Sequence, residues 1–294
     1  MRKHKFSIGY TLVVLSVCVF ALLCLYPFLL VVSGSLTTSA AAIQYGFRLI
    51  PAEFTLAAYQ TLLKDPSGII NGYKVTLFVT TVGTAASLLV NSMMAYVLSR
   101  STLPGRKFIN IYVLVTMLFS GGMVPWYIVC TRYLHLQNNI FALIVPILAS
   151  AWNIFLVRNY FSSISPAMHE SALLDGAGEF TIFTRIYIPL AKPVLATVLL
   201  FTALGYWNDW WHGLMLIEKQ NMQPLQMLLR SVVSNIQFLQ TADSSPEIQA
   251  LMASIPGDGL KMALVIVTTG PIILLYPFIQ KFFVKGIMVG SVKG

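Results

Sequence analysis

Long stretches without ionisable side chains constrain this chain more than any other feature. Five of them contain no Asp, Glu, Lys or Arg, and a sixth carries only Asp209, near its end. They are Tyr10–Val32, Val75–Ser99, Phe108–Thr131, Leu136–Val157, Pro193–Trp207 extended past Asp209, and Met262–Gln280. Since about 20 helical residues cross a hydrocarbon core of about 30 Å, the sequence predicts about six membrane crossings.

The composition excludes a water-soluble fold. Only 10% of the 294 residues are charged and 57% are hydrophobic, whereas about a quarter of a soluble domain is charged. Within hydrocarbon every backbone amide needs an internal partner, so that only helices or a closed barrel can span. Continuous runs of this length predict an all-α integral membrane protein with six transmembrane helices.

The first window raises the alternative of a cleaved signal peptide, because Arg2, Lys3 and Lys5 precede it. However, Tyr10–Val32 is too long for such a segment, and no small-residue cleavage site follows it. We therefore predict a retained first helix.

The net charge of +9 is better explained by the orientation of the protein in the membrane than by nucleic-acid binding, because the basic residues form no patch interleaved with aromatic residues. Residues 1–9, 99–107, 158–192 and 281–294 hold 12 of the 19 Lys and Arg. An excess of positive charge on short loops marks the cytoplasmic side. We therefore predict that both termini are cytoplasmic.

The domain organisation expected is one membrane domain over residues 10–294, after a cytoplasmic N-terminus of residues 1–9. Residues 162–192 form its long inner loop, and residues 218–259 form its longest outer segment, with a turn over Asp243–Glu247. A short helix is expected over Leu56–Leu63 in the first outer loop.

The inner loop reads as two short helices joined at glycines. Ser165 and Pro166 are a helix start with a capping hydroxyl, and Gly176 and Gly178 are typical of a helix end. The first helix is therefore expected from Pro166 to about Asp175. The second begins at Thr181 and ends before Pro189.

Two kinds of contact suit this first helix, one with a partner protein and one with the membrane surface. An acidic helix with a small face can dock into a partner's groove, where carboxylates meet Arg or Lys. The alternative is an amphipathic pair lying on the inner leaflet, but anionic lipid favours basic residues. Docking is the better reading. Its residues are the small Ala167, Ser171 and Ala172 and the acidic Glu170, Asp175 and Glu179.

The loop also carries a recognisable signature. Glu170-Ser171-Ala172, three residues, Gly176, nine residues and Ile186-Tyr187-Ile188-Pro189 resemble the EAA loop of binding-protein-dependent ABC importer permeases. Ser171 replaces an Ala of that signature and Ile188 replaces a Leu. Other stretches resemble the carbohydrate-uptake branch, close to the maltose importer's second permease: Tyr26-Pro27-Phe28, Trp207-Asn208-Asp209-Trp210 and the tail from Phe283 to Gly294.

The resemblance implies a type I importer of the bacterial cytoplasmic membrane. In such importers a second permease forms a heterodimer with this one, two ATPase subunits bind ATP and Mg, and an extracytoplasmic binding protein delivers the sugar. This chain has no phosphate loop of its own and needs no cofactor. The residues implied in ATPase coupling are Glu170, Ser171, Ala172, Asp175, Gly176, Ile186 and Pro189, with Glu170 in the ATPase cleft and Gly176 at the turn.

An oligosaccharide or polysaccharide fragment is the expected cargo, because the resemblance extends to permeases for long saccharides, including alginate-type uronates. Polar and aromatic residues in or near the spans are weak candidates for the translocation path. They are Asn208, Asp209, Trp152 and Asn153. Helix packing and an interfacial aromatic belt are the alternative explanation for them.

Three rival functions remain to be weighed. An ion-coupled transporter would usually place ionisable residues deep in its spans, and five windows have none. An intramembrane enzyme would need a catalytic pair or metal ligands, and His4, His135, His169 and His212 are isolated in the sequence. A permease for a non-sugar solute stays open as the third alternative.

Cys18, Cys24 and Cys130 are expected to be small core residues.

Overall fold

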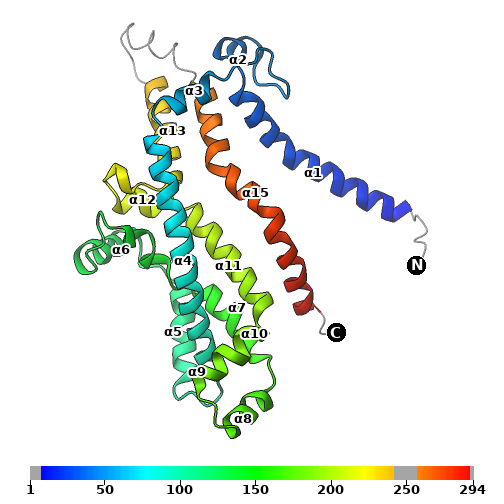
Figure 1. The fold of residues 1–294 in the computed structure, drawn as a ribbon, viewed down its shortest axis with the longest axis vertical. Helices are drawn as coiled ribbons and strands as arrows, with labels where there is room; N and C mark the ends of the chain where they lie inside the picture. Colours follow the sequence, from blue (N-terminus) through cyan, green and yellow to red (C-terminus); the bar gives the residue numbers. More distant parts are fainter. Residues whose placement is uncertain (1–7, 242–256, 292–294) are drawn as a thin grey trace. The chain divides into compact units, whose positions relative to one another are not determined.

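The structure, a computed structural model, describes residues 8–241 and 257–291. Within these ranges it is helical throughout apart from turns, loops and an isolated β-bridge between Thr37 and Phe54. Figure 1 shows the order of the helices along the chain. The chain divides into two compact units, residues 1–66 with 229–271 and residues 67–228 with 272–294.

The first unit begins with α1 (Ile8–Ser35), α2 (Ser39–Tyr45) and α3 (Ala57–Lys64). α1 comes from the first apolar window, and α3 lies within one residue of the short helix predicted there. The Ser35 hydroxyl at the end of α1 lies 2.9 Å from the Tyr59 hydroxyl of α3. α13 (Leu225–Thr241) and α15 (Gly257–Ser291) each contribute residues to both units. The turn predicted over residues 243–247 lies outside the described residues.

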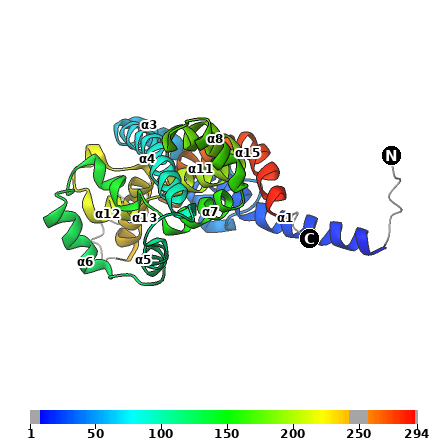
Figure 2. The same ribbon diagram turned by 90° about the horizontal axis from the view of Figure 1, so that it is seen from below.

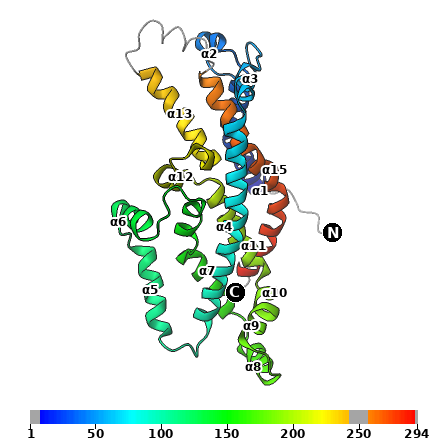
Figure 3. The same ribbon diagram turned by 60° about the vertical axis from the view of Figure 1, so that its left-hand side comes forward.

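The second unit is built on α4 (Ser67–Ser99), a helix of 33 residues. α7 (Ala151–Ser162) and α11 (Lys192–Trp207) pack along it, and α5 (Arg106–Leu118) lies beside α7 (Figure 3). α4 begins eight residues before the predicted window, because Lys74 is accommodated within the helix. Leu225, the first residue of α13, donates its backbone N–H to the Thr76 hydroxyl of α4 at 2.9 Å.

A buried amide joins α4 to the segment before α7. Asn91 is fully buried, its Nδ2 donates to the Leu148 carbonyl at 3.0 Å, and its Oδ1 accepts the Ser150 N–H at 2.9 Å. Both backbone groups lie where the helical path is interrupted, so they lack intrahelical partners. A polar residue inside a predicted span thus bonds across elements, as such residues usually do in membranes.

Two of the predicted spans are bent at a break rather than continuous. α5 and the segment of α6 (Met123–Ile128) with η1 (Val129–Tyr133) meet at 110°, where Gly122 has a φ of +86°. The segment of η2 (Ile140–Leu143) and η3 (Val145–Ile147) meets α7 at 50°. The prediction of uninterrupted helices there was wrong. These windows contain no ionisable residue, but Gly121-Gly122 and Pro146 interrupt the helices within them.

The fifth window ends earlier than predicted. α11 stops at Trp207, with Asn208 as its C-cap, and α12 (Trp211–Leu216) begins after Asp209. The Asp209 carboxylate accepts the His212 N–H at 3.2 Å and so caps α12. α11 does not extend past Asp209, because the Asp209 side chain bonds to the start of α12.

Length and composition allow three to six membrane spans. Three helices qualify alone, over Gly9–Ser35, Ser67–Ser99 and Gly257–Leu274, and the three bent pairs bring the number to six if each counts as one span. Cys130 is buried as predicted, whereas Cys18 and Cys24 are exposed on α1, so that their assignment to the core was wrong. An apolar side chain on a lipid-spanning helix has no need of a protein core.

Candidate functional site

The loop between α7 and α11 folds into two short helical arms. The first is α8 (Pro166–Leu174), with Pro166 at its first position as predicted; the Ser165 hydroxyl, however, makes no capping bond. Gly176 has a φ of +78°, and the Ala177 N–H bonds back to the Ala172 carbonyl at 2.9 Å. This left-handed residue closes α8, as expected of a glycine at a helix end. Gly178, predicted to share that role, instead opens the second arm.

The second arm is continuous through α9 (Glu179–Ile182), the π-helical η4 (Phe183–Tyr187) and α10 (Ile188–Leu190). It was expected to end before Pro189. A π-turn explains the difference. Ile188 donates its N–H to the Phe183 carbonyl five residues back. This shifts the hydrogen-bond register of the helix just before Pro189, the residue that has no N–H to donate. This arm meets α11 at 84°.

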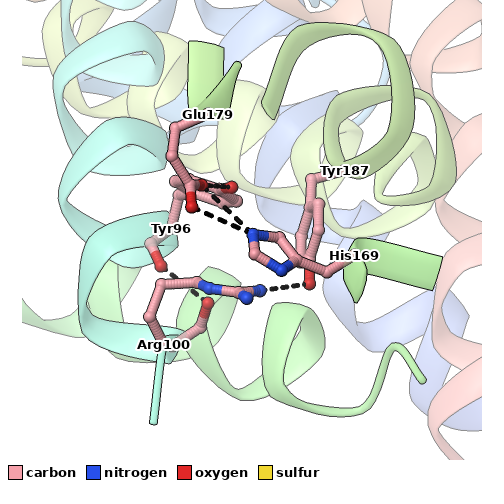
Figure 4. Close-up of polar contacts among 6 residues, drawn as sticks. Tyr96, Arg100, His169, Glu179 and Tyr187 are labelled. Atoms are coloured by element: carbon pink, nitrogen blue, oxygen red, sulfur yellow. Dashed lines mark hydrogen bonds and ion pairs between the residues drawn. The ribbon is translucent and has the colours of Figure 1, made fainter. Parts of the chain in front are cut away.

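A polar cluster connects both arms to the end of α4 (Figure 4). His169 of α8 places its Nε2 at 3.1 and 3.2 Å from the carboxylate oxygens of Glu179, across the Gly176 turn. The Tyr96 hydroxyl of α4 donates to the same carboxylate. Arg100 donates to the Tyr187 hydroxyl at 2.7 Å. We call these residues the clamp: Tyr96, Arg100, His169, Glu179 and Tyr187.

The clamp is packed as well as hydrogen-bonded. The Tyr96 ring lies edge-on to Tyr187, with 4.9 Å between ring centroids, and 6.2 Å from Phe161 of α7. His169 is only 4% exposed and Tyr187 2%. Figure 2 turns this end of the second unit, with α8, toward the viewer. Both arms are thus bonded and packed against the end of α4.

The clamp sets the charge state of its carboxylate. Partial burial acts to raise the pKa of Glu179. The hydrogen bonds from Tyr96 and His169 oppose this, as do the charges of a protonated His169 and of Arg100, and the pKa is lowered below its ordinary value. Glu179 therefore stays ionised at neutral pH, as an acceptor for both arms.

Not every residue expected on the docking face of α8 lies there. Glu170, Ser171 and Asp175 are exposed, and Leu174 is 89% exposed. Ala172 is only 8% exposed and packs into the core cluster beneath the loop, so that its assignment to the small outer face was wrong. It shares the inner side of α8 with His169, three residues earlier. Glu179 is exposed as expected, and its carboxylate also belongs to the clamp.

The remaining predicted coupling residues lie on the second arm or at the turn. Ile186 is partly buried and packs against the same core cluster. Pro189 is exposed on α10. The site thus consists of an exposed α8 face and, behind it, the clamp, of which Tyr96, His169 and Tyr187 are buried. Sequence reasoning missed the clamp, because its members are up to 91 positions apart.

The candidates for a translocation path separate into two pairs. Asn153 and Asp209 line a cavity in the second unit, together with His212. Trp152 is 61% exposed and Asn208 bonds the Leu204 carbonyl and Gln226; neither lines the cavity. His169 and His212, isolated in the sequence, each pair with a carboxylate. Within the described ranges, no three His, Cys, Asp or Glu side chains converge as a metal site.

Comparison with known families finds one match over nearly the whole chain. The family described as "Binding-protein-dependent transport system inner membrane component" matches residues 6–289. The match therefore includes the loop between α7 and α11 and the residues around the cavity.

Individual proteins are similar over comparable lengths. Protein LplC of Bacillus subtilis (strain 168) is 40% identical over 268 residues, which cover 91% of this chain and 89% of LplC. The polygalacturonan/rhamnogalacturonan transport system permease protein YtcP of the same strain is 39% identical over 280 residues, 94% of each chain.

A solved structure has the same fold. It is a crystal structure of a bacterial ABC transporter involved in the import of the acidic polysaccharide alginate. One of its chains is similar with a TM-score of 0.81 and 31% identity, over 96% of this chain and 100% of that one.

Proposed function

The chain belongs to the family of binding-protein-dependent transport system inner membrane components, and from that premise we propose that it is the permease subunit of an ATP-driven saccharide importer. It is a multi-pass inner-membrane protein, and in this family the permease is not catalytic. The observation that carries the proposal is the family match over residues 6–289, joined to permease relatives over nine-tenths of the chain. Transport then needs energy from a separate ATPase subunit.

The cargo we propose is a fragment of an acidic polysaccharide. YtcP is named for polygalacturonan and rhamnogalacturonan transport, and the similar solved structure comes from a transporter of alginate. Both names refer to uronate-containing polymers. An oligosaccharide rich in uronates is therefore the first cargo to test.

The partners in the importer are a second permease, an ATPase and a binding protein. We propose that the second permease is a homologue that completes a heterodimer, and that two ATPase subunits sit on the cytoplasmic side. This placement follows the excess of positive charge on the loops predicted to be cytoplasmic. It puts residues 162–192 on the ATPase side, with both termini.

The exposed face of α8 is the proposed contact with the ATPase. It presents Glu170, Ser171 and Asp175, and the apolar Leu174 stands 89% exposed beside them. An exposed leucine rimmed by carboxylates suits an apolar pocket bordered by Arg or Lys on a partner. Ala172 and Ile186 would support this face from below, and Gly176 and Pro189 would fix the path of the chain behind it.

The clamp would carry the motion of α8 into the membrane. His169 of the first arm and Tyr187 of the second are bonded to α4 through Glu179 and Arg100. When ATP closes the ATPase dimer, a displacement of α8 would move the α4 end with it, because no flexible linker separates them. Closure of the ATPase dimer would thus switch the membrane domain between its inward and outward openings.

Reconstitution in liposomes tests the proposal. The chain, its second permease, its ATPase and its binding protein are expected to accumulate labelled oligogalacturonate only when ATP is supplied. Glu170→Arg should lose most of this uptake, because it reverses a charge on the α8 face. Thr181→Arg, which places the same cationic side chain at an exposed position on the other arm, is the control and should retain it. Uptake without ATP, or uptake unchanged by Glu170→Arg, would contradict the proposal.

A further inference from the structure

A cavity of about 390 Å³ lies in the second unit, between α7, α11 and α12. Its size falls within the range of about 300–1,000 Å³ typical of sites for small ligands. The residues that define its chemistry are Asn153, Phe201, Thr202, Gly205, Asp209 and His212. Neither Lys nor Arg is among the residues that line it.

One wall of the cavity is a fixed pair of side chains. The His212 Nδ1 lies 2.9 Å from the Asp209 carboxylate, and both side chains are about nine-tenths buried, with 12% and 11% exposed. The imidazole also packs edge-on against both Trp211 and Trp126, at centroid distances of 5.0 and 5.4 Å. When His212 is neutral and donates its Nδ1–H to the Asp209 carboxylate, its Nε2 atom is the ring nitrogen able to accept a hydrogen bond from a hydroxyl.

The rest of the lining includes an amide, a hydroxyl and an aromatic ring. Asn153 is buried and its Nδ2 donates to the Thr202 hydroxyl at 3.3 Å. This single bond leaves further hydrogen-bonding capacity on the amide. The Phe201 side chain, one position before Thr202, is 49% exposed.

These groups match the chemistry of a sugar ring better than that of an ion or an apolar ligand. A pyranose has hydroxyls around its edge, which planar amide, imidazole and carboxylate groups bond well, and an apolar face, which packs on an aromatic ring. Asp209 is the one carboxylate among the described residues that line the cavity, and it is already bonded to His212, so a free cation would find no second anionic ligand there; without Lys or Arg the lining offers a carboxylate no positive partner.

We propose that this cavity binds one pyranose ring of the transported saccharide through its hydroxyls and one apolar face. The inference rests on the proposed function and adds a position: this subunit itself contacts the cargo, through α7, α11 and α12. His212 and Asn153 bond the hydroxyls, Phe201 packs on the ring, and Asp209 is a positioning residue that orients His212.

Gly205 gives the sharpest test, because it lines the cavity and no neighbouring atom lies within 4 Å of a Cβ added there. Gly205→Leu therefore fills the cavity without a backbone clash. Gly121→Leu is the matched control, since that glycine also has open surroundings and does not line the cavity. Both variants are assembled with the partner subunits and reconstituted in liposomes.

We expect Gly205→Leu to keep ATP hydrolysis stimulated by the loaded binding protein but to lose at least roughly tenfold in oligogalacturonate uptake, as loss of a ring contact would cause. Gly121→Leu should transport as wild type does. Uptake by Gly205→Leu at the wild-type rate would overturn the inference while leaving the proposed function intact. Failure of the wild-type importer to accumulate oligogalacturonate would instead overturn the proposed function itself.

A second measurement does not depend on the folding of Gly205→Leu. Binding of labelled digalacturonate is measured on the detergent-solubilised permease–ATPase complex without the binding protein. His212→Phe, which keeps a ring but removes the Nε2 acceptor, should bind about tenfold more weakly, as expected for a lost hydrogen bond. The methyl ester of digalacturonate should compete as well as the acid. Unchanged binding by His212→Phe, or competition by the acid alone, would refute hydroxyl recognition.

Discussion

At the residue scale, the Glu179 carboxylate is where the two arms of the loop meet α4. It accepts hydrogen bonds from His169 and Tyr96, although 59% of its own side chain is exposed. An exposed carboxylate alone contributes little to stability. Here its two donors are buried, and without Glu179 the His169 imidazole, which is only 4% exposed, would lose its hydrogen-bond partner.

The lowered pKa of Glu179 makes the clamp sensitive to acid. A carboxyl group whose folded-state pKa is depressed stabilises the fold above its unfolded pKa of about 4.3 and loses that effect as pH falls through the folded value. Wild type should therefore exceed Glu179→Gln in thermal unfolding temperature at pH 7, and the gap should narrow as pH falls below about 4. Thermal scans in detergent between pH 3.5 and 7 measure this; a gap independent of pH would contradict an ionised Glu179.

At the scale of elements, Gly176 sets the angle between the two arms. Its φ of +78° is unfavourable for any residue with a side chain, although no atom would contact an added Cβ. The strain in Gly176→Ala is therefore purely conformational. It is expected to cost about 1–2 kcal/mol.

Gly178→Ala is the control for that strain, because Gly178 has a φ of −73° and equally open surroundings. As the N-cap of α9, it should change the unfolding free energy by less than about 1 kcal/mol. Chemical unfolding of both variants in detergent compares them directly. Equal effects of the two substitutions would show that the left-handed turn does not hold α8 in place.

The same elements show how far sequence reasoning reaches. Local signals predicted α3, the start of α8 at Pro166 and the turn at Gly176, because caps, prolines and glycines act within a few residues. The Tyr96–Glu179 bond joins positions 83 residues apart, and no local pattern encodes it. Broken spans were missed for a different reason: apolar composition sets the length of a run, whereas glycine pairs and prolines decide whether the helix continues.

At the scale of the whole molecule, the sequence and its relatives agree on a membrane permease, while the cargo depends on a few side chains. Asn153 and Asp209 were candidates from polarity alone, and the fold brings them to one cavity with His212. Trp152 and Asn208 were equally plausible in sequence and lie elsewhere. The orientation of the termini stays a prediction, as does the contact between α8 and an ATPase.

The central claim is that the loop transmits the work of the ATPase into the membrane through the clamp. Tyr96→Phe removes one hydroxyl and keeps the ring that packs on Tyr187. A hydrogen bond to a charged group contributes about 1.5–3 kcal/mol, and less at a carboxylate as exposed as Glu179. The variant should therefore fold and assemble while its loop moves more independently of α4.

The most direct measurement is the number of ATP molecules hydrolysed per saccharide imported in proteoliposomes. Tyr59→Phe is the control, because it also removes a hydroxyl that is hydrogen-bonded, in this case to Ser35, far along the chain from the loop. The account predicts that this ratio rises in Tyr96→Phe, with hydrolysis maintained and import reduced, and that it stays at the wild-type value in Tyr59→Phe. A wild-type ratio in Tyr96→Phe would contradict transmission through the clamp.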